Sequence, residues 1–197
     1  MSSLGSSRGD REGEAGFTLV ELLVVMALML IVGSVVVNGI VSGLRAAERG
    51  RVRVEALTDL ELAAERMARD LRFADPVDGA SATQVIVNVL RDDAGTLVRH
   101  RVTFDVAGGT ITETRAVYDP PSSATATSMT VREVISDLDP ATTVFAFAKA
   151  DGQPWAPVTD ELFDLAEIRL DLRRELPDQD PIEVETSVFV RNVRDGR

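Results

Sequence analysis

The hydrophobic residues of this chain are concentrated in one uncharged run near the N-terminus, from Leu22 to Leu44. With its flank the apolar segment reads FTLVELLVVMALMLIVGSVVVNGIVSGL, the 28 residues 17–44. As a helix rising ~1.5 Å per residue, the segment spans ~42 Å, more than the ~30 Å hydrocarbon core of a bilayer. The pattern therefore predicts a membrane-length helix. Residues 1–16 are small, polar and charged, and we expect them to be disordered.

Beyond Leu44 the apolar positions change to an amphipathic helical spacing. They recur at intervals of three and four residues, at Leu57, Leu60, Ala64, Met67 and Leu71. Together with the apolar run, this spacing predicts one helix from Phe17 to about Phe73. We expect Asp75-Pro76 to end it, because the residue before a proline avoids helical geometry.

The charged residues of positions 45–72 lie largely opposite this apolar face. Two pairs have the spacing of helical ion pairs, Glu65 with Arg69 and Arg66 with Asp70. We therefore expect this charged side to be a solvated surface.

After Pro76 the apolar residues alternate with polar ones, which is typical of strands with one buried face. The pattern predicts strands over residues 84–90, 97–106, 110–117, 129–135, 144–148, 168–172 and 183–193. We expect an antiparallel sheet of five to seven strands laid against the apolar helix face. The predicted fold class is α+β, with the long N-terminal helix packed on an antiparallel β-sheet head.

The charge and the cysteine count exclude several classes of function. The chain has 21 Lys and Arg against 32 Asp and Glu, a formal net charge of -11. Such a surface repels a phosphate backbone, so we do not expect nucleic-acid binding by bulk charge. Cysteine is absent, which excludes disulfides and thiolate metal sites.

Residues for catalysis are scarce. His100 is the only histidine and falls in a predicted strand, where we expect it to be exposed. The sequence holds no phosphate-binding loop, nucleophile elbow or histidine pair. Asp178, Asp180 and Glu183 supply oxygens that Ca²⁺ prefers, but a solvated acidic loop is the expectation. We expect no enzyme activity, no cofactor and no metal.

Glu21 lies at the start of the apolar run and is its most unusual residue. A signal peptide would have a shorter apolar core and a cleavage site after it. A simple single-span anchor leaves Glu21 unexplained, because an acid in a membrane helix costs ~2.5–3.5 kcal/mol. Glu21 is therefore expected to have a partner.

The segment at the start of the run is Gly16-Phe17-Thr18-Leu19-Val20-Glu21-Leu22. It resembles the processing motif of type IV prepilins and type II secretion pseudopilins. The resemblance implies that prepilin peptidase cuts after Gly16 on the cytoplasmic side and methylates the new amine of Phe17. It also implies a role for Glu21 in subunit assembly. The leader is longer and less basic than is common in the family.

A pairing between subunits accounts physically for Glu21. In a bundle of such helices, the Glu21 carboxylate of one subunit can neutralise the Phe17 amine of its neighbour. The pair would offset two charges that are costly in a low dielectric and would fix the axial register.

A stripe of small and polar residues follows one side of the apolar helix, which we call the small-residue stripe. It consists of Ser34, Asn38, Gly39, Ser42 and Gly43. Such residues allow close approach of membrane helices and hydrogen bonds between them, although they are also common in membrane helices in general. We expect the stripe to pack against a neighbouring helix.

The resemblance divides the chain into four parts. These are a cytoplasmic leader (1–16), a transmembrane and filament-core helix (17–44), an amphipathic helix continuing into the head (45–75) and a β-rich head domain (76–197). It places the head outside the cytoplasm, on a single span of the cytoplasmic membrane. Arginines are more numerous directly after the span than before it, which favours the opposite orientation. We follow the resemblance.

A narrower resemblance is carried by residues 63–72 (AAERMARDLR) and 186–192 (TSVFVRN). Both stretches look like PilW-type minor pilins and J-type minor pseudopilins. The function implied is a minor pilin or pseudopilin of a type IV pilus or of a type II secretion or DNA-uptake pseudopilus. Its implied partners are prepilin peptidase, other pilins and the inner-membrane assembly platform. The alternative is a single-pass membrane-anchored binding module with an acidic β domain.

Overall fold

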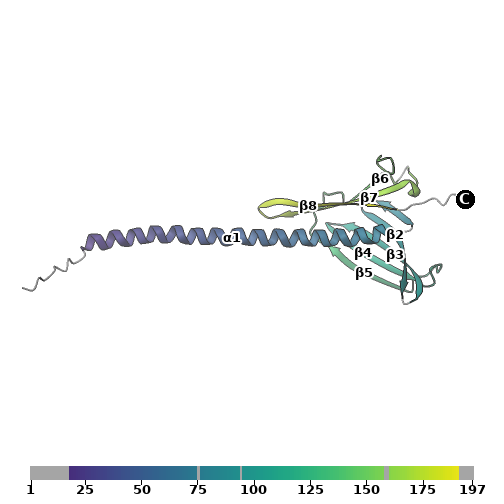
Figure 1. Cartoon of the computed structure of the whole chain (residues 1–197), viewed down its shortest axis with the longest axis horizontal. Coiled ribbons are helices and arrows are strands. Elements are labelled where there is room, and N and C mark those ends of the chain that lie inside the picture. The colour runs from purple at the N-terminus through teal and green to yellow at the C-terminus, as the bar shows by residue number, and fades with distance from the viewer. Residues whose placement is uncertain (1–17, 75, 94, 158–159, 191–197) are drawn as a thin grey trace, which may run out of the picture. The chain divides into compact units, whose positions relative to one another are not determined.

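The computed structural model describes residues 18–74, 76–93, 95–157 and 160–190. The chain divides into two compact units, the first ending at Arg49 and the second beginning at Gly50. The helix α1 (Leu19–Arg72) begins in the first unit and ends in the second (Figure 1). Its end confirms the predicted stop before Pro76, and the predicted start at Phe17 lies outside the described residues.

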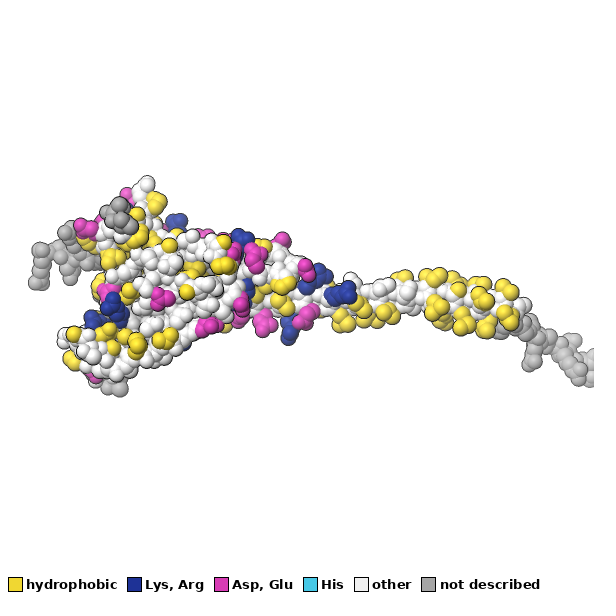
Figure 2. Space-filling view, turned by 180° about the vertical axis from the view of Figure 1, so that it is seen from behind, with side chains coloured by type: hydrophobic (Ala, Val, Ile, Leu, Met, Phe, Trp, Pro, Cys, Tyr) yellow, Lys and Arg dark blue, Asp and Glu magenta, His cyan; other side chains and the backbone are white. Residues whose placement is uncertain are grey.

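The first unit is the apolar part of α1. Its described residues, from Thr18 to Arg49, are all exposed, and Figure 2 shows hydrophobic side chains crowded along this stretch. By length and composition α1 is apolar enough to cross a membrane. Exposed apolar surface of this extent calls for cover by lipid or by other helices.

The described residues of the second unit form the rest of α1, eight strands and a short 3₁₀ helix, η1 (Leu162–Asp164). One antiparallel sheet has the order β1 (Val77–Ser81), β2 (Gln84–Asp93), β3 (Thr96–Ala107), β4 (Thr110–Tyr118) and β5 (Ser128–Ile135). The other has the order β6 (Phe145–Lys149), β7 (Leu165–Leu176) and β8 (Gln179–Phe189). The α+β class with a helix packed on antiparallel sheet is confirmed.

The prediction of one sheet was wrong, because the strands form two. Strand periodicity identifies a buried face but does not determine which strands pair. β1 was not predicted, since its sequence VDGAS has no alternating apolar pattern and buries only Val77. β8 begins at Gln179, within the segment expected to be a loop.

The core lies where α1 meets both sheets. The helix buries a face rich in small residues, made of Ala56, Leu60, Ala63, Ala64, Met67, Ala68 and Leu71. Leu57, predicted on this face, is 37% exposed, because the buried stripe is centred on Leu60 and Met67. Phe104 of β3 and Leu170 of β7 belong to the same core cluster. Alanines on the helix allow strands to approach it closely, and each fully buried large side chain contributes about 1.5–3 kcal/mol.

Candidate functional site

Thr18 caps the N-terminus of α1, next to the predicted cleavage site. Its Oγ1 accepts a hydrogen bond from the backbone N–H of Glu21 at 3.3 Å. Its carbonyl oxygen accepts one from the N–H of Leu22 at 3.2 Å. The sequence prediction gave Thr18 no role, although Thr-x-x-Glu is the signature of a capping box. Gly16 and Phe17 lie outside the described residues.

The Glu21 side chain is exposed in the first turn of the helix. Among the residues that the structure describes, it has no ion-pair partner. The helix dipole favours a carboxylate at this end by about 0.3–1 kcal/mol. That is less than the ~2.5–3.5 kcal/mol cost of burying the carboxylate in a membrane. We therefore expect the partner of Glu21 to lie outside the described residues.

The small-residue stripe is exposed throughout. Ser34 donates its hydroxyl hydrogen to the carbonyl oxygen of Ile31 at 2.8 Å, so this group is satisfied within its own helix. A Cβ added at Gly39 or Gly43 would meet no atom within 4 Å. The surface is therefore open to a neighbouring helix, and packing by the stripe stays a prediction.

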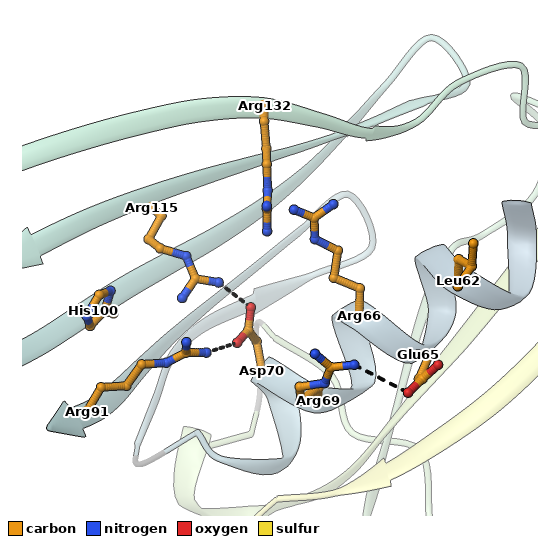
Figure 3. Close-up of a pocket in the computed structure, with 9 residues that line it drawn as sticks. All are labelled: Leu62, Glu65, Arg66, Arg69, Asp70, Arg91, His100, Arg115 and Arg132. Carbon is orange, nitrogen blue, oxygen red and sulfur yellow. Dashed lines mark hydrogen bonds and ion pairs between the residues drawn. The ribbon is translucent and has the colours of Figure 1, made fainter. Parts of the chain in front are cut away.

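A second candidate site is a cavity of about 650 Å³ in the head, which we call the arginine pocket (Figure 3). It lies between the last turns of α1 and the strands β2 to β5. Its lining residues are Leu62, Glu65, Arg66, Arg69, Asp70, Arg91, His100, Arg115 and Arg132.

Two buried carboxylates hold the arginines of this pocket in place. Asp70 is 4% exposed and Glu113 is 1% exposed. Asp70 accepts a hydrogen bond from Arg91 at 2.7 Å and another from Arg115. Glu113 accepts from Nε of Arg115 at 3.0 Å and from Nε of Arg132 at 2.9 Å. Buried carboxylates of this kind need such partners, since burying an unpaired charge is costly.

These contacts correct the prediction of a solvated charged side of the helix at Asp70 and Arg66, whereas the other charged residues of positions 45–72 are exposed. Asp70 faces the five-stranded sheet instead of pairing with Arg66, which lies 3.6 Å from Glu113 through its Nε. The predicted pair of Glu65 and Arg69 does form, at 3.3 Å. The spacing of charges along the helix cannot predict that Asp70 is buried, because its partners come from other elements.

His100 was expected to be exposed and is buried, with 8% exposure. It shares the inward face of β3 with Val98, Val102 and Phe104. The alternation of these residues in the sequence could have predicted that His100 is buried. Neither ring nitrogen has a hydrogen-bond partner among the described residues. Burial and then the nearby charges of Arg115 and Arg91 lower the pKa of His100, against a smaller opposing effect of Asp93.

Residues 12–37 match the family model of the prokaryotic N-terminal methylation motif. The match supports a type IV pilin-like family. No curated protein matches the chain. The matched segment includes the residues on which the resemblance was based, Gly16, Phe17 and Glu21.

The motif implies processing by prepilin peptidase and assembly with other pilins. It indicates a structural subunit. The motif and the apolar helix α1 near the N-terminus fit a membrane-anchored pilin. Within the described ranges, no cluster of three or more acidic or histidine side chains has a metal-binding arrangement. This applies also to Asp178, Asp180 and Glu183, of which the last two lie in β8.

His100 is expected to make the stability of the head depend on pH. Its pKa is lowered in the folded chain, so the unfolded chain binds more protons as the pH falls below about 6.5. The folded state should therefore lose stability below that pH. A His100→Asn variant should lose less than wild type between about pH 7.5 and pH 5.5. Thermal unfolding across that range tests this, and parallel curves for the two proteins would contradict it.

Proposed function

We propose that this chain is a minor pilin or pseudopilin, cut between Gly16 and Phe17, methylated on Phe17 and built into a filament of a type IV pilus or a type II secretion or DNA-uptake system. The methylation motif over residues 12–37 carries the proposal. It is supported by the exposed apolar length of α1, which needs cover by lipid before assembly and by other helices afterwards.

The proposed organisation follows the four parts expected from the sequence. Residues 1–16 form the leader, residues 17–44 the membrane and filament-core helix, residues 45–75 its amphipathic continuation and residues 76–197 the head. We place the head outside the cytoplasm, first on the cytoplasmic membrane and then in the pilus or pseudopilus. The inner-membrane assembly platform is its proposed partner there. The resemblance of residues 63–72 and 186–192 favours the PilW-type and J-type minor subunits.

Glu21 is the proposed assembly residue. Its carboxylate has no partner within the described chain, and cleavage would create a positively charged amine at Phe17 of each subunit. Pairing the two between neighbours would offset the cost of both charges. Thr18 supports this arrangement by capping the helix through the N–H of Glu21, which leaves the carboxylate available.

A Glu21→Gln variant should insert into the membrane and be cleaved normally but assemble poorly. We expect crosslinking to neighbouring subunits to fall at least about ten-fold, because a glutamine cannot neutralise the amine. The matched control is Glu61→Gln, an exposed acid further along α1. Equal crosslinking in Glu21→Gln and wild type would show that the carboxylate has no partner.

The alternative, a single-pass membrane-anchored binding module, has the same helix and the same acidic head. It requires no cleavage and no pairing by Glu21. The state of the Gly16-Phe17 bond in the mature protein distinguishes the two.

A further inference from the structure

The arginine pocket carries an excess of positive charge on an acidic protein. Five arginines line it, against four carboxylates that line it or contact its residues, those of Glu65, Asp70, Asp93 and Glu113. With His100 neutral, the local balance is one positive charge, whereas the whole chain has a formal net charge of -11. The site therefore attracts negative groups that the rest of the surface repels.

Several guanidinium N–H groups of this pocket are not used by the protein. Arg66 makes its contact with Glu113 through Nε alone, at 3.6 Å. Arg69 contacts only the exposed Glu65, at 3.3 Å through one Nη. The other N–H groups of both side chains have no hydrogen-bond partner among the residues described. In Figure 3 the Arg66 and Arg132 guanidinium groups, which both contact Glu113, lie close beside each other.

His100 gives independent evidence that a polar ligand is missing from the pocket. It lines the cavity, is nine-tenths buried and has no hydrogen bond to either ring nitrogen in the described structure. Its nearest acidic oxygen, on Asp93, is 3.6 Å away. Buried polar groups are seldom left without partners, because each costs about 1–3 kcal/mol.

We propose that the arginine pocket binds carboxylates on an acidic segment of a partner protein. The guanidinium group is suited to carboxylates, since its planar fork donates two parallel hydrogen bonds. The cavity of about 650 Å³ has room for several side chains. Leu62 is the only apolar residue among those that line it, so the complementary ligand is charged.

The charge of the whole chain selects the class of partner. A nucleic acid or an anionic membrane presents an extended array of negative charges, which a net charge of -11 repels. A short acidic peptide segment places its charges only in the pocket. The inference adds a partner site in the head to the proposed function and does not depend on cleavage at Gly16.

The test is binding of a fluorescent hexaglutamate peptide to the full chain in detergent micelles, with hexaglutamine as the neutral probe. We expect hexaglutamate to bind and hexaglutamine not to bind. Arg66→Gln should weaken binding about ten-fold. The matched control, Arg169→Gln on β7, makes the same change in net charge in the three-stranded sheet and should leave binding unchanged.

The proposal is overturned if hexaglutamate does not bind, or if Arg169→Gln weakens its binding as much as Arg66→Gln does. It is also overturned if inorganic phosphate displaces the peptide at equal concentration, because the site would then select small anions. A melting curve for each variant verifies folding. Arg69→Gln provides a second test, since the Arg69 side chain is 63% exposed and contacts only Glu65; it should weaken binding in the same direction.

Discussion

Replacing Glu113 with alanine is expected to lower the free energy of unfolding of the head by about 3–5 kcal/mol. The carboxylate is 1% exposed and accepts hydrogen bonds from Arg115 and Arg132, with Arg66 nearby. Its removal leaves these guanidinium groups facing one another without the charge that compensates them. The loss exceeds that of a surface ion pair, which is about 0–1 kcal/mol, because the Glu113 carboxylate is buried.

Denaturant unfolding of the full chain in detergent, followed by fluorescence, measures this loss. Trp155 is the only tryptophan, is buried in the head and donates a hydrogen bond to the Glu161 carbonyl at 2.9 Å. Glu113→Gln keeps the size of the side chain and separates lost charge from lost volume. The control is Glu133→Ala, an exposed acid on β5. Similar losses for Glu113→Ala and Glu133→Ala would refute the structural role of the buried carboxylate.

Replacing Gly16 with valine is expected to abolish processing of the chain. A peptidase binds its substrate in an extended form, and a residue without Cβ fits a narrow subsite. A β-branched side chain at Gly16 should block that fit. The uncut chain would then have no charged amine at Phe17 and could not form the proposed pair with Glu21.

Gly5→Val is the matched control, since it makes the same change elsewhere in the leader. Immunoblots of membranes from cells containing the peptidase should show a single uncut band for Gly16→Val. They should show the wild-type cut band for Gly5→Val. A cut band for Gly16→Val at the wild-type level would mean that cleavage does not depend on this glycine.

The elements of the fold were largely predictable, because helices and strands have local periodicities. Leu60, Met67 and Leu71 have the three- and four-residue spacing of a helix face, and all three are buried. The alternation of Val102 and Phe104 likewise predicted β3 and its inward face. The two-sheet arrangement was not predictable in this way, because pairing between distant strands has no local signal.

The arginine pocket could not be predicted from the sequence, because its residues come from distant segments. Asp70 binds Arg91 and Arg115, which are 21 and 45 residues away in the sequence. Glu113 binds Arg132, which is 19 residues away. Each of these residues alone is consistent with a solvated surface, and only the fold brings them together. The N-terminal motif is the opposite case, because its residues are contiguous and were identified from the sequence alone.

The central claim is that the mature chain begins at Phe17, and the intact mass of the protein tests it most directly. The protein would be purified from membranes of cells with and without prepilin peptidase. With the peptidase, the account predicts the mass of residues 17–197 plus one methyl group, and without it the mass of the chain with its leader. A mature protein that still begins at Met1 or Ser2 in the presence of the peptidase would contradict the account.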